Sequence, residues 1–562
     1  MIDSGLTPDV SGRRRQGEGG SRRPRPMVFR MRSDAGVDPS PGAPEVHRDS
    51  AAPAIAAAIF VGSLLVFLVR APGLEYFLTN RDHGYQLCLG GQILLHRIPG
   101  VDSITWYGPM TMYTSALGLW ASGSLVGEAV LCATGYAACL TLLYLLVAAN
   151  GSRAAGAAAA VVGYLVLARF YKWYIWLIPL ATLWSLRGWL AAPLGLRPRR
   201  LAECGLVVGL SWLYRPDMGT LEFAAIAALI GVLEIGRPPF RLGRSLTTFT
   251  LATSAFPLAW LAYLAVAVTP AAPLEYLRTT VESSLALSRG MALPLPPIFS
   301  VVFGYGASLG TLAVSIGAGF YLVWKGGDPL RGRFLLASGL IGASIFHQAM
   351  HRRDPQHLLQ VIPPVIVAGF ACLDLLGRAF EKSAGSPRRR WAWGSLGLGY
   401  GGVFATAVVG MALWARLDLA PVTTRPDRRY EELARPLDQG DAFPAVRAVQ
   451  FVRENTTLAD SVLVFPLDCQ LLALAERRLS GRLHSYYPNV LNDPAQSAAN
   501  LEAIRADAPA LVVLPSTSPP AAWPSDDFAR YARSTHPYLD EYIKAEYPRV
   551  VFDDGQTKIL AR

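Results

Sequence analysis

The apolar residues of this chain fall into blocks of about 20 residues rather than into short alternating or amphipathic patterns. A helix of about 20 residues is long enough to cross the roughly 30 Å hydrocarbon core of a bilayer. The 562 residues are 52% hydrophobic and only 17% charged, with a mean hydropathy of +0.30. Ordinary soluble domains are about 25% charged. These features exclude a soluble enzyme, a disordered chain and a fibrous repeat.

The apolar blocks predict a bundle of membrane helices. Residues 154–190 are long enough for one or two crossings, and we count them as one long or broken crossing. That count gives 11 helices in total, or 13 if a further short segment is present. The predicted spans are 52–70, 107–122, 126–149, 154–190, 203–216, 218–235, 246–268, 297–324, 334–349, 358–377 and 392–414.

The charge of the loops sets the orientation, because short loops rich in Lys and Arg stay in the cytoplasm. An odd number of crossings then places the N-terminus inside and the C-terminus outside. Fourteen Lys and Arg lie in one set of loops, near 191–202, 236–245, 325–333 and 378–390. Only six lie in the alternating set, at 71–106, 269–296 and 350–357.

Three parts follow in order along the chain. Residues 1–50, with nine arginines and no apolar period, are predicted to be a disordered, Arg-rich cytoplasmic tail; contact with a lipid surface is the alternative. Residues 51–415 form the membrane domain, and residues 416–562 a soluble domain on the outer face. The bias toward Ala, Arg, Gly and Leu is typical of a GC-rich bacterium, which indicates the bacterial cytoplasmic (inner) membrane.

The last part has the pattern of a small α/β domain. Residues 443–455 have helical spacing, whereas 461–466 and 510–514 are short apolar runs typical of buried strands. An Asp-Gly turn divides the segment 550–560 into two short strands. Two further helices are expected at 468–477 and 498–505. The predicted fold class is therefore mostly α: a polytopic membrane helix bundle with a C-terminal soluble α/β domain.

The sequence favours neither a metal nor a nucleic acid. Its six cysteines are scattered without a Cys-x-x-Cys motif, and no disulfide framework is expected. His347, His351 and His357 are a poor metal set, because Asp354-Pro355 breaks the helix before His357. Twenty Lys and Arg lie in the loops between apolar blocks, so nucleic acid is not an expected partner.

Ionisable residues near a bilayer are costly and tend to be functional. They form four groups on the predicted outer side, where a carboxylate can act as general base and cations can hold a phosphate. These groups are Arg81-Asp82-His83 with Asp102 in the same loop; Tyr214-Arg215-Pro216-Asp217; Glu275, Tyr276, Arg278, Glu282 and Arg289; and His347 with His351-Arg352-Arg353-Asp354-Pro355-Gln356-His357.

The stretch NRDHGYQLCLGGQILLHRIPGVDSITWYGPMTMY resembles the first outer loop of the membrane-integral C-type glycosyltransferase superfamily (GT-C). Asp82 matches its first acidic residue, Asp102 the second, and Gly108-Pro109 the start of the following helix. GLSWLYRPDMG resembles a further passage of bacterial members. His83 replaces the second acid of the doublet found in many members, which favours a type without a metal.

The resemblance implies transfer of a sugar from a polyprenyl-phosphate carrier to a glycan, lipid or protein acceptor at the outer face, with inversion and with no cofactor. It implies that Asp82 is the general base. We expect eight further residues to bind substrate or phosphate: His83, Asp102, Arg215, Asp217, His351, Arg352, Arg353 and His357.

Structural roles compete with these assignments. Asp82 could pair with Arg81 or Arg97, Asp102 could stabilise a turn, and Arg215 could pair with Asp217. The residues from His351 to His357 could be a solvated interfacial turn, and Lys172 is expected in an interfacial aromatic belt. A secondary transporter, or a non-catalytic membrane assembly or sensor protein, is the alternative function.

Overall fold

The computed structural model describes residues 51–234, 239–290, 301–325, 328–351, 353–415, 418–486, 494–515 and 537–562. The tail predicted at residues 1–50 lies outside these described residues.

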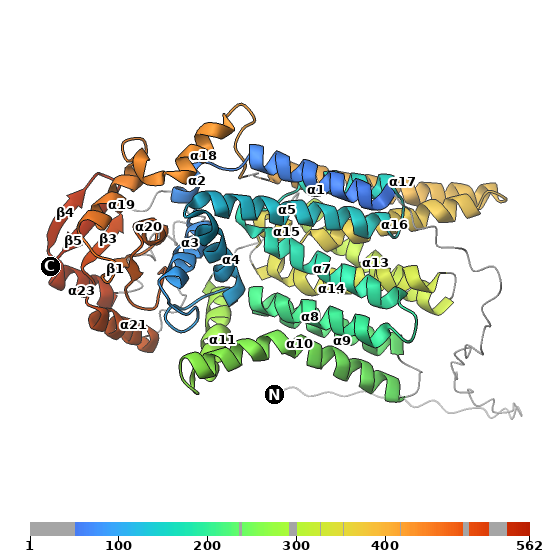
Figure 1. Cartoon of the computed structure of the whole chain (residues 1–562). Helices are drawn as coiled ribbons and strands as arrows, with labels where there is room; N and C mark the ends of the chain where they lie inside the picture. The colour runs from blue at the N-terminus through green and yellow to red at the C-terminus, as the bar shows by residue number, and fades with distance from the viewer. Residues whose placement is uncertain are drawn as a thin grey trace, which may run out of the picture. The chain divides into compact units, whose positions relative to one another are not determined.

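Helices account for most of the described chain (Figure 1). The helices up to the start of the C-terminal part are α1 (Ala51–Val69), α2 (Leu74–Thr79), α3 (Arg81–Leu94), α4 (Pro109–Ser122), α5 (Leu125–Ala148), α6 (Arg153–Leu165), η1 (Phe170–Lys172), α7 (Trp173–Ala191), α8 (Arg197–Tyr214), α9 (Pro216–Glu234), α10 (Pro239–Ala267), α11 (Ala272–Gly290), η2 (Val301–Gly306), α13 (Ala307–Lys325), α14 (Pro329–His351), α15 (Pro355–Gln360), α16 (Pro363–Lys382) and α17 (Pro387–Trp414).

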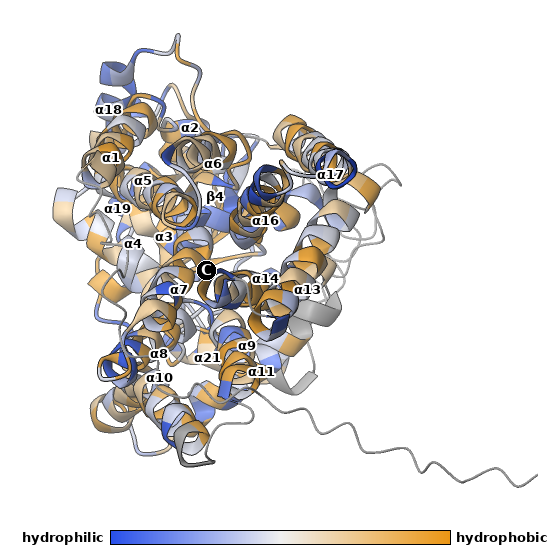
Figure 2. Cartoon of the chain, turned by 90° about the vertical axis from the view of Figure 1, so that its right-hand side faces the viewer, coloured by the Kyte–Doolittle hydropathy of each residue, from blue (hydrophilic) through white to orange (hydrophobic). Residues whose placement is uncertain are grey.

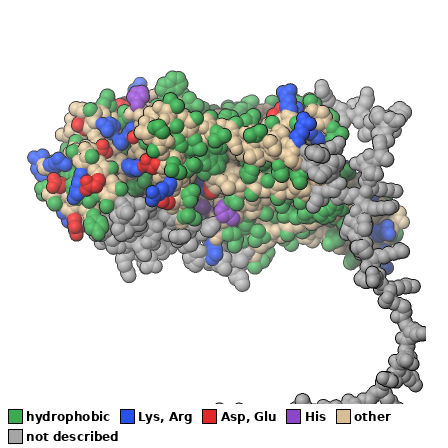
Figure 3. Space-filling model, turned by 90° about the horizontal axis from the view of Figure 1, so that it is seen from below, with side chains coloured by type: hydrophobic (Ala, Val, Ile, Leu, Met, Phe, Trp, Pro, Cys, Tyr) green, Lys and Arg blue, Asp and Glu red, His purple; other side chains and the backbone are tan. Residues whose placement is uncertain are grey.

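The bundle has the character of a membrane domain. Within the described residues, seven helices are long and apolar enough to cross a bilayer: α1, α5, α9, α10, the η2–α13 segment, α16 and α17. Helices α1, α10 and α17 lie at the rim of the bundle (Figure 2). Their exposed hydrophobic residues include Leu65, Leu258 and Leu398. Charged side chains gather over the C-terminal domain and at the far end of the helices, and the band between them is mostly uncharged (Figure 3).

Contacts at the two ends of α4 correct the assignment of one predicted span. Gly108, at the start of α4, donates a hydrogen bond to the Tyr214 carbonyl at 2.9 Å, and Glu128, in the first turn of the following helix α5, bonds to His83 in α3. Both ends of α4 therefore lie at the end of the bundle that carries α3, and residues 107–122 do not cross. The physical reason is packing, because α4 lies along α3, where Gly90 permits a close approach to Ala116.

Residues 154–190 also differ from the prediction of one long or broken crossing. The chain forms α6, leaves the helical conformation through Val166–Arg169, and returns as α7. Arg187 near the end of α7 donates to the Ala149 carbonyl at 3.0 Å, so α7 ends beside the start of the α5–α6 connection. Without α4, three helices (α5, α6 and α7) run between the loops at 71–106 and 191–202. The number of crossings between these loops is therefore still odd, as predicted.

The C-terminal part contains the predicted α/β domain. Its five strands, in sheet order β2-β1-β3-β5-β4, combine parallel pairs (β1 with β2 and with β3) and antiparallel pairs (β3 with β5, β5 with β4). The elements are α18 (Pro426–Ala434), η3 (Pro436–Gln439), α19 (Pro444–Glu454), β1 (Ser461–Val464), α20 (Gln470–Ala475), β2 (Arg478–Leu479), α21 (Pro494–Asp507), β3 (Leu511–Pro515), α23 (Pro537–Glu546), β4 (Arg549–Asp553) and β5 (Thr557–Ala561). The predicted helices, strands and Asp-Gly turn of this domain are confirmed.

Helix α3 is held between the bundle and this domain. Gln92 donates to the Arg477 carbonyl at 2.9 Å and accepts from the Leu479 amide at 2.8 Å. Gln470 in α20 donates to the Leu78 carbonyl just before α3 at 2.8 Å. Gly91 allows the close approach, because a Cβ there would lie 3.1 Å from Cα of Ala473 in α20. The C-terminal domain therefore fixes the helix that carries Asp82.

The predicted orientation can be tested with single cysteines, because all six native cysteines are buried. Leu458 is 59% exposed in the C-terminal domain, and a Cβ added at Gly385, in the α16–α17 loop, meets no atom within 4 Å. On intact cells, a membrane-impermeant maleimide should label Leu458→Cys and should reach Gly385→Cys only after permeabilisation. Labelling of Gly385→Cys on intact cells would contradict the orientation.

Candidate functional site

Asp82 lies in the first turn of α3, where the residues that precede it fix the helix start. The Asn80 side chain accepts a hydrogen bond from the His83 amide at 3.1 Å and so caps the helix. A carboxylate in a first turn is favoured by the helix dipole. The segment predicted as an outer loop is thus folded, and Asp82 is presented from a rigid helix.

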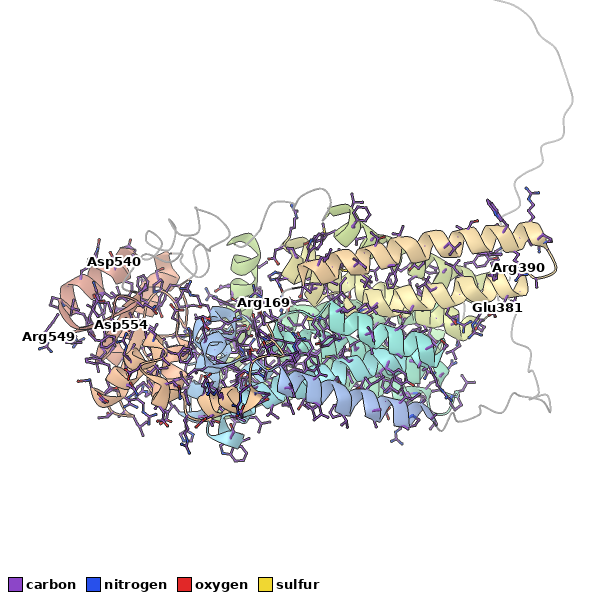
Figure 4. The ribbon with its side chains drawn as sticks, turned by 90° about the horizontal axis from the view of Figure 1, so that it is seen from above. Arg169, Glu381, Arg390, Asp540, Arg549 and Asp554 are labelled. Carbon is purple, nitrogen blue, oxygen red and sulfur yellow. The ribbon has the colours of Figure 1, made fainter. Side chains whose placement is uncertain are left out.

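The Asp82 carboxylate is paired with Arg169, which lies in the break between α6 and α7. The two side chains are 30% and 25% exposed, so neither is fully solvated. The alternative partners named above are engaged elsewhere: Arg81 pairs with Asp468 at 2.9 Å, and Arg97 donates to the Leu479 carbonyl at 2.9 Å. Figure 4 shows Arg169 where the long helices meet the part of the chain that carries the C-terminal domain.

A second carboxylate, Asp418, faces the same arginine. Asp418 follows α17, lies within electrostatic range of Arg169 and Asp82, and accepts a hydrogen bond from the Phe170 backbone. Burial raises the pKa of Asp418 above its usual range, and the Arg169 charge only partly offsets this. Arg169 therefore interacts with carboxylates from two segments that are more than 330 residues apart in sequence.

Two further cations surround the ring of Tyr107. Lys172 is buried, bonds to the Tyr107 hydroxyl and lies within electrostatic range of both Asp82 and Arg215. The Arg215 guanidinium lies 4.6 Å from the centre of the Tyr107 ring. This environment corrects the expectation for Lys172, which is part of the cation cluster and not of a lipid-facing aromatic belt.

Arg215 and Asp217 form a bidentate pair at the junction of α8 and α9. Arg215 donates to Oδ1 of Asp217 at 2.9 Å and to Oδ2 at 2.7 Å. Gln348 of α14 also donates to Oδ2, at 2.9 Å. The structural role considered for this pair is therefore present. It also places the Arg215 guanidinium over Tyr107, so the pair positions a cation of the cluster.

His83 is turned away from Asp82 and fully buried. Its Nε2 lies 2.9 Å from Oε1 of Glu128, and the same oxygen accepts from Ser115 at 3.0 Å. Among the described residues, His83, Glu128 and Cys132 form the one group whose ligand atoms, all within 4.8 Å of one another, could hold a metal. Burial leaves the His83 ring no open face for a phosphate, which weighs against its predicted binding role.

Asp102 stabilises a turn, which is the structural role considered above as the alternative to substrate contact. Its Oδ2 accepts from the Ile98 amide at 2.7 Å, and a backbone bridge joins Pro99 to Ser103 around it. This turn ends the segment between α3 and the extended approach to α4.

The turn after α14 is built as the Asp354-Pro355 signal predicts. Asp354 caps α15 by accepting from the His357 amide at 2.9 Å, and its carboxylate also contacts the His357 ring at 2.8 Å. Arg353 donates to the Met350 carbonyl at 3.0 Å. Arg352 and the side chain of His351 lie outside the described residues. The turn is also tied to η2, because the Tyr305 hydroxyl donates to the Asp354 carbonyl at 3.2 Å. Its predicted phosphate contacts remain a prediction.

The sequence reading missed Arg169 and Asp418. Arg169 stands in Ala-Arg-Phe-Tyr-Lys-Trp, inside a block that reads as one membrane span, and Asp418 stands in the linker after the last helix. A charged residue within a long apolar block was the available signal for Arg169. No local signal marks Asp418, because only the fold brings it to Arg169.

No protein-family model matches the sequence, and no curated protein matches it. Similar solved structures include ArnT from Cupriavidus metallidurans in the apo state, at 14% identity and a TM-score of 0.47, covering 91% of this chain and 98% of ArnT. ArnT bound to undecaprenyl phosphate matches with the same identity and TM-score over 91% and 97%. The Archaeoglobus fulgidus oligosaccharyltransferase with a tethered acceptor peptide matches at 13% identity and 0.44, over 87% and 72%. Likenesses of this size do not by themselves assign any of these activities to the chain.

The Arg215–Asp217 pair can be tested by a double-mutant cycle. The two side chains are 13% and 32% exposed, so Arg215→Ala leaves a largely buried carboxylate with only Gln348 among its described side-chain donors. We expect a loss of about 3 kcal/mol, the order found for breaking a buried pair. The melting temperature in detergent should fall in Arg215→Ala and recover largely in the Arg215→Ala/Asp217→Ala double variant. A double variant less stable than Arg215→Ala would contradict the pairing.

Proposed function

We propose that this chain is a membrane-integral glycosyltransferase of the C type, which transfers a sugar from a polyprenyl-phosphate carrier to an acceptor at the outer face of the bacterial cytoplasmic membrane. The observation that supports this most is the grouping of the Asp82 carboxylate with three cations, Arg169, Lys172 and Arg215, where the bundle meets the C-terminal domain. The grouping matches the two chemical demands of this reaction, a base and a phosphate site.

The donor has an apolar chain for the bilayer and a charged phosphate near the surface. The cation cluster supplies charge-assisted donors for the phosphate oxygens, and Arg can bind two of them at once. A phosphate bound there competes with Asp82 for Arg169. In this proposal, donor binding therefore draws Arg169 toward the phosphate and leaves the Asp82 carboxylate more basic.

The reaction needs one carboxylate. The acceptor hydroxyl oxygen attacks the anomeric carbon of the sugar from the face opposite the phosphate, and its proton passes to Asp82. The bond between the anomeric carbon and the phosphate oxygen breaks, and the polyprenyl phosphate leaves with the electron pair. The configuration at the anomeric carbon is inverted. The leaving phosphate is already stabilised as an anion, so a separate strong acid is not needed.

The position of the charges argues against the transporter alternative. Substrate sites of secondary transporters lie near the bilayer midplane, between repeated halves. Here Asp82 lies on a helix that contacts the C-terminal domain, and its partner Arg169 lies in the break between α6 and α7. The non-catalytic alternative does not require a carboxylate and cations to converge.

The central test is Asp82→Asn, which keeps the size of the side chain but removes its ability to take a proton. General-base catalysis contributes about 10²–10⁴-fold, so kcat should fall by that order. The assay measures transfer from a panel of radiolabelled polyprenyl-phosphate sugars to lipid and glycan acceptors, with melting temperature in parallel. Asp468→Asn, which changes the neighbouring pair with Arg81 and a contact with Gln470 but leaves the Asp82 carboxylate in place, is the matched control and should retain activity. Unchanged turnover in Asp82→Asn would remove Asp82 from the mechanism.

A second test concerns the metal. With His83 in place of a second acid, and with its ring directed at Glu128, we propose that Asp82 acts without a bound metal. Transfer should persist in EDTA, and added Mg²⁺ or Mn²⁺ should not raise the rate. Loss of transfer in EDTA with recovery on adding a divalent cation would overturn this part of the proposal.

A further inference from the structure

A pocket of about 600 Å³ lies beside the site, between the segment that follows α1 and the segment that follows α17. This volume is in the range of pockets that bind small molecules. Its walls combine apolar, aromatic and charged side chains, and one of them is Asp418. The lining residues include Gly73, Glu75, Tyr76, Asp418, Arg429 and Glu432.

Asp418 and Tyr76 line the pocket, and each carries an enclosed polar atom without a hydrogen-bond partner among the described residues. These atoms are Oδ2 of Asp418 and the hydroxyl of Tyr76. A buried polar atom without a partner is costly, which makes a ligand-derived partner favourable. Asp418 also faces Arg169, the partner of Asp82, so the inner wall of the pocket lies next to the proposed reaction centre.

The pocket lies at the outer end of a helix that faces lipid. Leu65 and Val69 near the end of α1 are 57% and 42% exposed, and the lining begins three residues later, at Pro72. Arg429 ties the two walls to this helix by donating to the Ala71 carbonyl at 2.5 Å and to the Val69 carbonyl. A molecule with an apolar chain along α1 can therefore place its headgroup in the pocket.

The charges of the lining favour a neutral, hydroxyl-rich headgroup over a phosphate. The lining holds three arginines, Arg425, Arg428 and Arg429, and three carboxylates, Glu75, Asp418 and Glu432, so its formal charge is zero. Arg425 is paired with Asp427 at 2.6 Å, and Arg429 donates to backbone carbonyls. Carboxylates accept hydrogen bonds from hydroxyl groups but repel phosphate.

We propose that this pocket is the acceptor site and that it binds the sugar headgroup of a lipid-anchored acceptor, with Asp418 and Tyr76 hydrogen-bonded to sugar hydroxyls. The proposal rests on the glycosyltransferase function proposed above and adds the class of the acceptor. Donor phosphate and acceptor sugar then approach Arg169 and Asp82 from different sides.

A photoactivatable alkyl glucoside tests the site directly, because its capture does not depend on turnover. The probe is octyl β-D-glucoside with a diazirine in its alkyl chain, added to the full chain in nanodiscs. Crosslinks should map to the peptides around 65–76 and 418–432 and should be displaced by unlabelled octyl glucoside. Octanol at the same concentration should not displace them. Crosslinks spread over α10, α13 and α17 as well, or equal displacement by octanol, would show lipid-like contact and overturn the proposal.

Two variants separate the pocket from the surrounding surface. Gly73 has an ordinary backbone conformation with φ of −82°, so a larger residue is tolerated there. A Cβ at this position would lie 3.5 Å from Glu432 and 3.7 Å from Arg429, both in the pocket lining. Gly73→Trp should therefore fill the pocket and reduce capture by at least about 10-fold. The matched control is Gly62→Trp on α1, where a Cβ meets no atom within 4 Å. Asp418→Asn should weaken capture by about 10-fold, the size of one charge-assisted hydrogen bond. Full capture in both Gly73→Trp and Asp418→Asn would overturn the proposal.

The two proposals fail differently. If the glucoside is captured in the pocket but no polyprenyl-phosphate sugar is ever consumed, the acceptor pocket stands as a glycolipid site and the transferase function fails. If transfer occurs and Gly73→Trp leaves the KM for a lipid-anchored acceptor unchanged, the transferase function stands and the pocket assignment fails.

Discussion

The positive charge of Arg169 is the constraint around which the outer part of this molecule is arranged. A guanidinium that is three-quarters shielded from water must be neutralised, because an unpaired charge in such a place costs several kcal/mol. Asp82 from α3 neutralises it, and Asp418 from the segment after α17 lies within electrostatic range of it. One side chain from the break between α6 and α7 thus fixes the relative positions of three segments that are distant in sequence.

The same arrangement explains why a soluble domain is part of the site. Helix α3 carries Asp82 at its first turn, and its other end is bonded to the C-terminal domain through Gln92. The helix cannot shift without disturbing either the Arg169 pair or the sheet. The domain therefore acts on the site as a support, and its own segment before α18 adds Asp418 and a wall of the neighbouring pocket.

Neighbouring residues of one motif have very different environments. Asp82 and His83 are adjacent, yet Asp82 is directed at Arg169 and remains 30% exposed, whereas His83 is fully buried against Glu128. Successive side chains on a helix point about 100° apart, so one faces the site and the next faces the core. A motif read as a string of candidate ligands could not make this distinction. Gly108 is a similar case: its role is the close approach to the Leu213 carbonyl, where a Cβ would lie at 2.0 Å.

The sequence by itself determined the class of the fold, the predicted orientation and the helices and strands of the C-terminal domain. Each of these depends on local composition or periodicity: block length, loop charge, alternation and turn residues. It also pointed to Asp82 and Arg215, because charged residues at the edge of apolar blocks are conspicuous. Only the tertiary structure decided that α4 does not cross, that Arg169 is the partner of Asp82, and that Lys172 and Asp418 join them. These facts depend on contacts between segments up to several hundred residues apart, and no local pattern encodes which of several possible charged partners the packing of the helices will bring together.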